Sequence, residues 1–181
     1  NTPSLPINFP SPRAVRHVHA SGARRTAAHI LSLQHTHMYT VDELNDRLID
    51  LAFSEDIGDG DHTTLCCIPD DAMGRQRLLI KEEGILAGMR IAKEIFHRFD
   101  PTMQVEQTMH DGDHVRPGDV PMIVTGKVRS LLQTERLMLN VMQRMSGIAT
   151  MTHEYVKRLE GTHTRVLDTR KTTPGMRMLE K

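Results

Sequence analysis

The sequence predicts an α+β fold, in which helices cover a small antiparallel sheet and a separate α/β unit begins near the end of the chain. Three strand-like runs, at 76–81, 103–107 and 120–127, are interrupted by an amphipathic helix over 89–99. Further along, a short buried strand over 164–168 leads through a polar loop into a new helical pattern. The first pattern is typical of an α+β sandwich, and the second is typical of one strand and helix of a parallel α/β domain.

Residues 1–37 differ in character from the rest of the chain. They contain four arginines and no acidic residue, and they are rich in Pro, Ser, Ala and His without apolar periodicity. We expect this stretch to be disordered or a non-native extension. Its composition also suits a transit peptide, although its prolines argue against an amphipathic helix, and upstream read-through or a cloning remnant is an equal alternative. Met38 is a natural start codon.

The first predicted helix runs over 41–54. Thr40 and Glu43 form a capping-box pattern, and apolar residues follow at helical spacing. Residues 55–64 are predicted to form a polar loop because glycines there permit tight turns. The loop carries three aspartates, Asp56, Asp59 and Asp61. Their spacing departs from the EF-hand pattern and no Glu closes the loop, so we assign no metal there.

The second half of the chain alternates helix and strand. The helix over 89–99 places five apolar residues on one face: Met89, Ala92, Ile95, Phe96 and Phe99. From 128 to 160 the pattern is helical, and Gly147 is predicted to separate two helices. The strand over 164–168 and the helix beginning at Met176 then form one α/β unit. A lone parallel strand cannot satisfy its backbone groups, so we expect the sequence to be truncated.

Composition excludes two classes of function. From Met38 onward the chain has 19 basic and 23 acidic residues, and the whole sequence has two Tyr, four Phe and no Trp, which argues against nucleic-acid binding. Its apolar runs are far shorter than the roughly 20 residues that span a bilayer.

Cys66 and Cys67 are adjacent, a spacing that suits neither an ordinary disulfide nor a CxxC motif. We therefore predict free thiols in a reducing compartment and a cytoplasmic protein.

The loop after the last predicted strand carries the strongest functional signal. Chemistry in α/β barrels lies in the loops at the carboxyl ends of parallel strands. Arg170 and Lys171 are adjacent cations in such a loop, which indicates an anionic ligand. Taken alone, the pair would more often be a solvated turn.

Several stretches in unbroken order resemble the quinolinate phosphoribosyltransferase family. The strongest are residues 134–150 and residues 168–175, whose sequence is DTRKTTPG. Residues 55–61 and 83–88 match the same family. The similarity runs from about Met38 to the end of the chain, whereas the residues before it resemble nothing in the family. On these motifs the chain resembles an amino-terminal part, about two thirds, of a member of that family.

The resemblance implies a fold and an activity. Residues 38–145 would form the N-terminal α/β sandwich domain and a linking helix, and residues 146–181 would form the first helices and first strand of an incomplete α/β barrel. The reaction would be phosphoribosyl transfer from phosphoribosyl pyrophosphate to quinolinate with decarboxylation. Its products are nicotinate mononucleotide, pyrophosphate and CO2, in NAD biosynthesis.

The resemblance also implies the site residues. Arg136, Thr169, Arg170 and Lys171 would bind substrate, and Lys171 would also be catalytic. In a homodimer or higher homo-oligomer, Arg136 would reach the neighbouring subunit's site, whereas Arg170 and Lys171 would line the chain's own barrel mouth. Mg2+ would accompany phosphoribosyl pyrophosphate through ligands beyond residue 181. The fragment alone would therefore be inactive.

Two alternatives remain open at this point. A molybdenum-locus homologue shares the fold and many motifs but acts on a different or uncertain substrate. A non-catalytic carrier or interaction module is suggested by the turn at 111–119, which resembles lipoyl and biotinyl carrier domains. Such carriers need a modifiable lysine at a hairpin tip, and none lies at such a turn in this sequence, so a lipoyl or biotinyl adduct on Lys127 is what would test this alternative.

Overall fold

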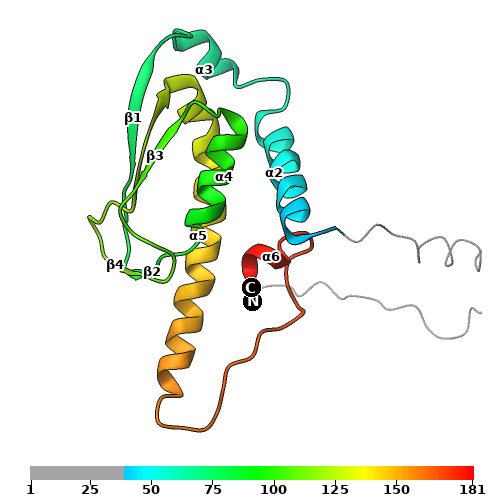
Figure 1. The fold of residues 1–181 in the computed structure, drawn as a ribbon, viewed down its shortest axis with the longest axis vertical. Helices are drawn as coiled ribbons and strands as arrows, with labels where there is room; N and C mark the ends of the chain where they lie inside the picture. Colours follow the sequence, from blue (N-terminus) through cyan, green and yellow to red (C-terminus); the bar gives the residue numbers. More distant parts are fainter. Residues whose placement is uncertain (1–38) are drawn as a thin grey trace, which may run out of the picture. The chain divides into compact units, whose positions relative to one another are not determined.

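Residues 39–181 are the part of the chain that this computed structural model describes, and the predictions made for residues 1–37 and Met38 lie outside it. Figure 1 shows the order of the elements, with sequence colours running from cyan at α2 to red at α6. The helices are α2 (Val41–Ile57), α3 (His62–Cys67), α4 (Met89–Phe99), α5 (Val128–Arg158) and α6 (Arg177–Glu180). The strands are β1 (Met73–Leu78), β2 (Gly84–Ile85), β3 (Gln104–Gln107), β4 (His114–Val115) and β5 (Met122–Lys127).

The predicted capping box at the start of α2 is confirmed. The Thr40 hydroxyl accepts a hydrogen bond from the Glu43 N–H at 3.2 Å, and the Glu43 carboxylate accepts one from the Thr40 N–H at 2.7 Å. The helix continues to Ile57 and ends at Gly58, whose φ of 56° suits glycine. The prediction of a loop over 55–64 was therefore too long at both ends, because α2 occupies its beginning and α3 its end.

The predicted antiparallel sheet is confirmed, with strand order β1-β5-β3 and β5 in the centre. β3 and β5 lie within two residues of their predicted starts, whereas β1 begins at Met73, three residues before its predicted start. The short antiparallel pair β2-β4 was not predicted, because two-residue strands carry no measurable alternation.

The apolar face of α4 forms the centre of the core, as its periodicity predicted. Met89, Ala92, Ile95 and Phe96 are buried, and each larger side chain contributes roughly 1.5–3 kcal/mol by leaving water. Phe99 is partly buried, and its ring lies 5.3 Å from that of Phe53 on α2. The same core includes residues of β5 and α5, and α5 contacts both α4 and the sheet.

The prediction of a helix break at Gly147 is wrong, since α5 is one continuous helix. A glycine inside a helix costs only about 1 kcal/mol relative to alanine, and tertiary contacts can offset that cost. Ser146 accepts a hydrogen bond from the Ala87 N–H at 3.0 Å, and Thr150 accepts one from the Ile85 N–H at 2.9 Å. The helix is thus anchored to the β2 segment on both sides of Gly147, and it runs through the predicted domain boundary at 145/146.

The prediction of a strand over 164–168 is also wrong for the described part of the chain. Residues 161–168 are exposed and belong to no sheet there, and Leu167 is 85% exposed. A strand forms only when a neighbour pairs with its N–H and C=O groups, and residues 39–181 offer this segment none. The helix predicted to begin at Met176 is present as α6, whose Leu179 is buried.

Candidate functional site

Arg136 lies on α5 and is held by two carboxylates from the N-terminal part of the described chain. Its Nε is 3.1 Å from both carboxylate oxygens of Asp56, and one terminal nitrogen is 3.6 Å from Asp61. The Arg136 side chain is 51% exposed, whereas that of Asp61 is 12% exposed. Hydrogen bonds from Thr64, together with the positive charge of Arg136, hold the pKa of Asp61 below its ordinary value. The guanidinium is therefore fixed at its inner edge and open at its outer edge.

Thr169, Arg170 and Lys171 lie together on an exposed loop. The loop is ordered locally by the Thr169 hydroxyl, which accepts a hydrogen bond from the Lys171 N–H at 3.2 Å. The Arg170 carbonyl accepts one from the Arg177 guanidinium at 3.1 Å. Within residues 39–181, no hydrogen bond or ion pair involves the Arg170 guanidinium or the Lys171 ammonium group. This loop thus carries two adjacent exposed cations.

Two further arginines attach that loop to the helices, and sequence reasoning missed both. Arg144 on α5 donates to the Glu180 carboxylate at 2.7 Å and to the Thr173 hydroxyl at 2.6 Å. Hydrogen bonds from Thr173 and Arg144 hold the pKa of Glu180 below its ordinary value. Arg177 donates to the Thr172 hydroxyl at 3.2 Å. Arg144 lies inside the motif at 134–150, but its role depends on a contact 36 residues away.

The structure does not bring Arg136 into contact with Arg170 or Lys171. Arg136 is paired with the end of α2 and the start of α3, whereas the loop of Arg170 is tied to α6 and the middle of α5. The prediction that Arg136 serves one subunit's site while Arg170 serves another's stays a prediction.

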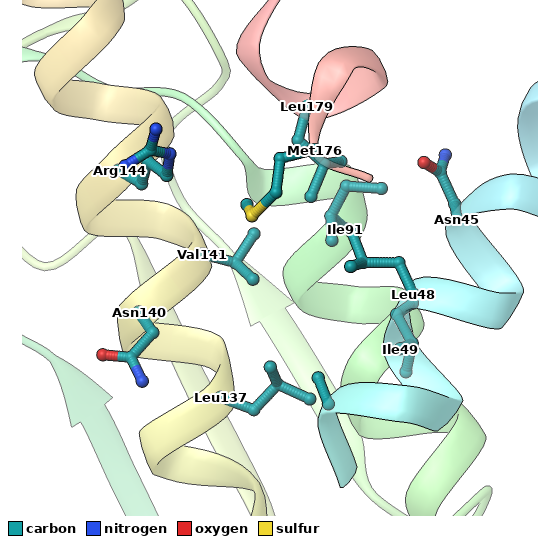
Figure 2. Close-up of a pocket in the computed structure, with 11 residues that line it drawn as sticks. Asn45, Leu48, Ile49, Ile91, Leu137, Asn140, Val141, Arg144, Met176 and Leu179 are labelled. Carbon is teal, nitrogen blue, oxygen red and sulfur yellow. The ribbon is translucent and has the colours of Figure 1, made fainter. Parts of the chain in front are cut away.

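Two cavities of the described chain are lined by other residues than these predicted ones. An apolar groove of about 200 Å³ lies between α2, α4, α5 and α6 (Figure 2). Its walls are mostly aliphatic, as Figure 2 shows for Leu48, Ile91 and Val141, and its polar lining residues are Asn45, Asn140 and Arg144. A second cavity of about 480 Å³ is bounded by α5, the segment before α4 and the end of the chain. An aliphatic groove does not suit a dianionic ligand, so the exposed loop is the better candidate site.

Further observations bear on metals, carriers and membranes. Within residues 39–181, no three His, Cys, Asp or Glu side chains are grouped so that they could hold a metal ion. Lys127 is the last residue of β5 and directly precedes α5, so it does not lie at a hairpin tip as a carrier lysine would. Cys66 and Cys67 are exposed free thiols, as predicted. Among the described helices, none combines the length and the hydropathy that crossing a bilayer requires.

Comparison with known proteins places this architecture in a class of phosphoribosyltransferases. The family model for the N-terminal domain of quinolinate phosphoribosyl transferase matches residues 61–146, and the model for the C-terminal domain matches residues 148–181. The two matches follow one another in the chain and include the motifs at 83–88 and 168–175. The chain belongs to the quinolinate phosphoribosyltransferase family.

Individual relatives support the same assignment. A decarboxylating quinolinate phosphoribosyltransferase, 1b, of Nicotiana tabacum is 44% identical over 136 residues, which are 74% of this chain and 38% of the relative. A carboxylating nicotinate-nucleotide pyrophosphorylase of Bacillus subtilis is 43% identical over 135 residues, 75% of this chain and 46% of the relative. The crystal structure of NadC from Streptococcus pyogenes has a TM-score of 0.72 at 38% identity, covering 75% of this chain and 49% of that one.

The chain spans about half or less of the length of the curated relatives it matches. One relative matches further towards the N-terminus. Quinolinate phosphoribosyltransferase 2a, mitochondrial, of Nicotiana tabacum is 37% identical over 177 residues, which are 97% of this chain and 49% of the relative. That alignment reaches into the stretch before Met38, which corrects our expectation that residues 1–37 resemble nothing in the family.

Proposed function

We propose that this chain is part of an enzyme that transfers the phosphoribosyl group of phosphoribosyl pyrophosphate to quinolinate, with decarboxylation. The products are nicotinate mononucleotide, pyrophosphate and CO2, which is a step of NAD biosynthesis. One observation carries the proposal: the loop that presents Arg170 and Lys171 lies in the segment matched by the family's C-terminal domain model. The names of the relatives, which specify quinolinate and decarboxylation, support the choice of substrate.

The two cations suit different parts of the substrates. Quinolinate carries two carboxylates, and a planar guanidinium pairs with a carboxylate through two parallel hydrogen bonds. We therefore assign a carboxylate of quinolinate to Arg170. Lys171 is a compact cation, and we assign it to the charge that develops between the substrates, with Thr169 holding the loop and contacting substrate.

In the proposed reaction the pyridine nitrogen of quinolinate forms a bond to the anomeric carbon of the ribose, and pyrophosphate leaves with the electrons of the broken C–O bond. The ring nitrogen then carries positive charge. That charge accepts the electron pair released when the bond between ring carbon 2 and its carboxylate breaks, and the carbon takes up a proton as CO2 departs. No covalent enzyme intermediate is required, so catalysis rests on positioning and charge stabilisation.

Two further elements of the proposal concern partners. Mg2+ would neutralise the pyrophosphate charge, and we place its ligands outside residues 39–181. We also propose a homodimer in which Arg136 of one subunit completes the site that contains Arg170 of the other. The half-exposed side chain of Arg136, which leaves it accessible to a second subunit, supports this arrangement.

The experiment uses a completed protein, defined here as residues 1–181 followed by the remaining C-terminal domain of the Bacillus subtilis relative. It measures release of labelled CO2 from quinolinate labelled in the 2-carboxylate, together with pyrophosphate. We expect both products to form in equal amounts, and only when quinolinate, phosphoribosyl pyrophosphate and Mg2+ are all present. Nicotinate in place of quinolinate serves as the control for pyrophosphate release without decarboxylation.

The same assay separates the alternatives. A molybdenum-locus homologue would release no labelled CO2 under any of these conditions. A carrier module would instead show a lipoyl or biotinyl mass increase on Lys127, which intact-mass measurement of the chain detects. Either result would remove the proposed function.

For the compartment, we propose a reducing one, with the cytoplasm as first choice, because Cys66 and Cys67 are exposed and unpaired. Relatives named mitochondrial and chloroplastic make organelle import the competing outcome. Imaging of a fluorescent fusion with and without residues 1–38 decides between them. Organelle fluorescence that is lost with those residues would overturn the cytoplasmic assignment.

A further inference from the structure

The acidic segment 56–61, which includes the end of α2 and leads to α3, takes no part in the reaction proposed above, yet its charges converge on one of the substrate arginines. Asp56 and Asp61 both approach the Arg136 guanidinium, from positions 80 and 75 residues earlier in the chain. The third aspartate of the segment, Asp59, has a side chain that is 92% exposed and approaches only His62, at 3.4 Å. Two carboxylates of the segment therefore contact Arg136, and the third does not.

Secondary structure fixes both carboxylates before Arg136 reaches them. Asp56 lies in the last turn of α2, where the helix dipole disfavours negative charge and a neighbouring cation is therefore favourable. Asp61 is the N-cap of α3, and its carboxylate accepts hydrogen bonds from the Thr64 N–H and hydroxyl at 3.3 and 2.8 Å. Arg136 follows the buried Thr134 on α5 and precedes the buried Leu137, so its backbone is fixed as well.

We infer that Asp56 and Asp61 are positioning residues, which hold the Arg136 guanidinium in one orientation so that its remaining N–H donors meet a substrate carboxylate. The inference rests on the proposed function for the identity of that carboxylate. A guanidinium has five N–H donors in a rigid fork. Asp56 takes the Nε donor and Asp61 lies beside one terminal nitrogen, so the outer edge of the fork stays available.

Two opposing effects make the direction of the result informative. If the carboxylates only shield Arg136, removing one raises the local positive potential, and the dianionic substrate binds more tightly. If they orient Arg136, removing one lets a flexible side chain adopt several orientations, and the substrate binds less well. If the carboxylates and Arg136 formed only an exposed ion pair with no functional role, removing one carboxylate would leave substrate binding unchanged, because such pairs contribute little energy.

The first measurement uses chain 1–181 and tests whether Asp56 holds the Arg136 side chain in place. Asp56→Asn keeps the size of the side chain and removes its charge, and Asp61→Asn keeps a good N-cap for α3. In nuclear magnetic resonance spectra we expect the Arg136 Nε–H to exchange with water at least several-fold faster in Asp56→Asn than in the unmodified chain. Asp59→Asn is the matched control and should leave this rate unchanged. Equal rates in the unmodified chain and in Asp56→Asn would overturn the inference.

The second measurement tests the consequence for substrate, in the completed protein. We expect Asp56→Asn to raise the KM for quinolinate by about five- to twentyfold while the KM for phosphoribosyl pyrophosphate stays within about twofold. In an Arg136→Ala background, Asp56→Asn should add nothing, because a positioning residue acts only through the group it positions. A lower quinolinate KM, an unchanged one, or an additive effect in that background would each refute the positioning role.

The two measurements separate failure of the inference from failure of the proposed function. Slow Nε–H exchange combined with no quinolinate-dependent turnover in the unmodified completed protein would show that Arg136 is held but that quinolinate is not its ligand. That result overturns the substrate half of the inference together with the proposed function. Fast exchange combined with normal turnover would overturn the inference alone.

Discussion

The attachment of α5 to the β2 segment gives a prediction whose magnitude follows from the structure. Ser146 and Thr150 lie one turn apart on α5 and supply the hydroxyls that accept the Ala87 and Ile85 N–H groups. Ser146→Ala removes the first acceptor, and Thr150→Val removes the second with almost no change of shape. Each substitution leaves a partly buried N–H without its partner.

An unsatisfied buried donor costs about 1–3 kcal/mol, and partial exposure places each of these near the lower end of that range. We therefore expect each single variant to lose about 1–1.5 kcal/mol of unfolding free energy. Gly147→Ala is the internal control, because an added Cβ there meets no atom within 4 Å. An alanine inside a helix should stabilise the chain by up to about 1 kcal/mol relative to glycine. Ser146→Ala should thus lower the unfolding free energy, whereas the neighbouring Gly147→Ala should raise it.

Urea denaturation of chain 1–181, followed by circular dichroism, measures these differences. Amide exchange of Ile85 and Ala87 reports the local effect, and both N–H groups should exchange faster in the matching variant. The attachment would be refuted if Thr150→Val matched the unmodified chain in both stability and Ile85 exchange. Destabilisation by Gly147→Ala would show that space beside this glycine is used in a way the described structure does not explain.

Three further predictions concern the core, acid stability and substrate recognition. Phe96→Ala should cost about 3–5 kcal/mol in urea denaturation, because Phe96 is only 1% exposed. Hydrogen bonds from Thr102 and Ser130 hold the pKa of Asp100 below its ordinary value, so its carboxylate stabilises the fold above the ordinary pKa and loses this effect as the pH falls through the lowered value. The gap between the denaturation midpoints of Asp100→Asn and the unmodified chain should therefore stay constant near neutral pH and close only as the pH falls below the ordinary pKa of the carboxyl group, and a gap that persists at the most acidic pH would contradict this. In the completed protein, Arg170→Lys should lower quinolinate use about ten- to a hundredfold, because losing one charge-assisted hydrogen bond costs roughly 1.5–3 kcal/mol. Unchanged kcat/KM for quinolinate would exclude Arg170 as a ligand.

Elements whose signals are local were predictable from the sequence. The capping box at Thr40 and the apolar face of α4 lie within one element each, so spacing alone located them. The continuity of α5 at Gly147 was not predictable, because the contacts that hold the helix come from residues about 60 positions earlier. The isolated segment at 164–168 has a strand-like composition, but pairing depends on a neighbour that residues 39–181 do not supply.

The candidate site likewise contains residues that the sequence could identify and residues that it could not. Arg170 and Lys171 were found because they stand side by side after an apolar run and match a family motif. The two aspartates that hold Arg136 were noticed only as a weak calcium pattern, since nothing local relates them to an arginine on α5. Arg144 was overlooked because its partners belong to the segment that follows the predicted strand.

Mixing two variants of low activity tests the central claim most directly, because it asks whether Arg136 and Arg170 from different subunits serve one quinolinate site. Completed proteins carrying Arg136→Lys and Arg170→Lys are unfolded together in equal amounts, refolded and assayed for labelled CO2 release. In a random mixture about half of the dimers contain both variants, and in each of these one of two sites has both arginines intact. The account predicts that activity recovers to about a quarter of that of the unmodified protein. Activity no higher than the mean of the two separate variants would contradict it.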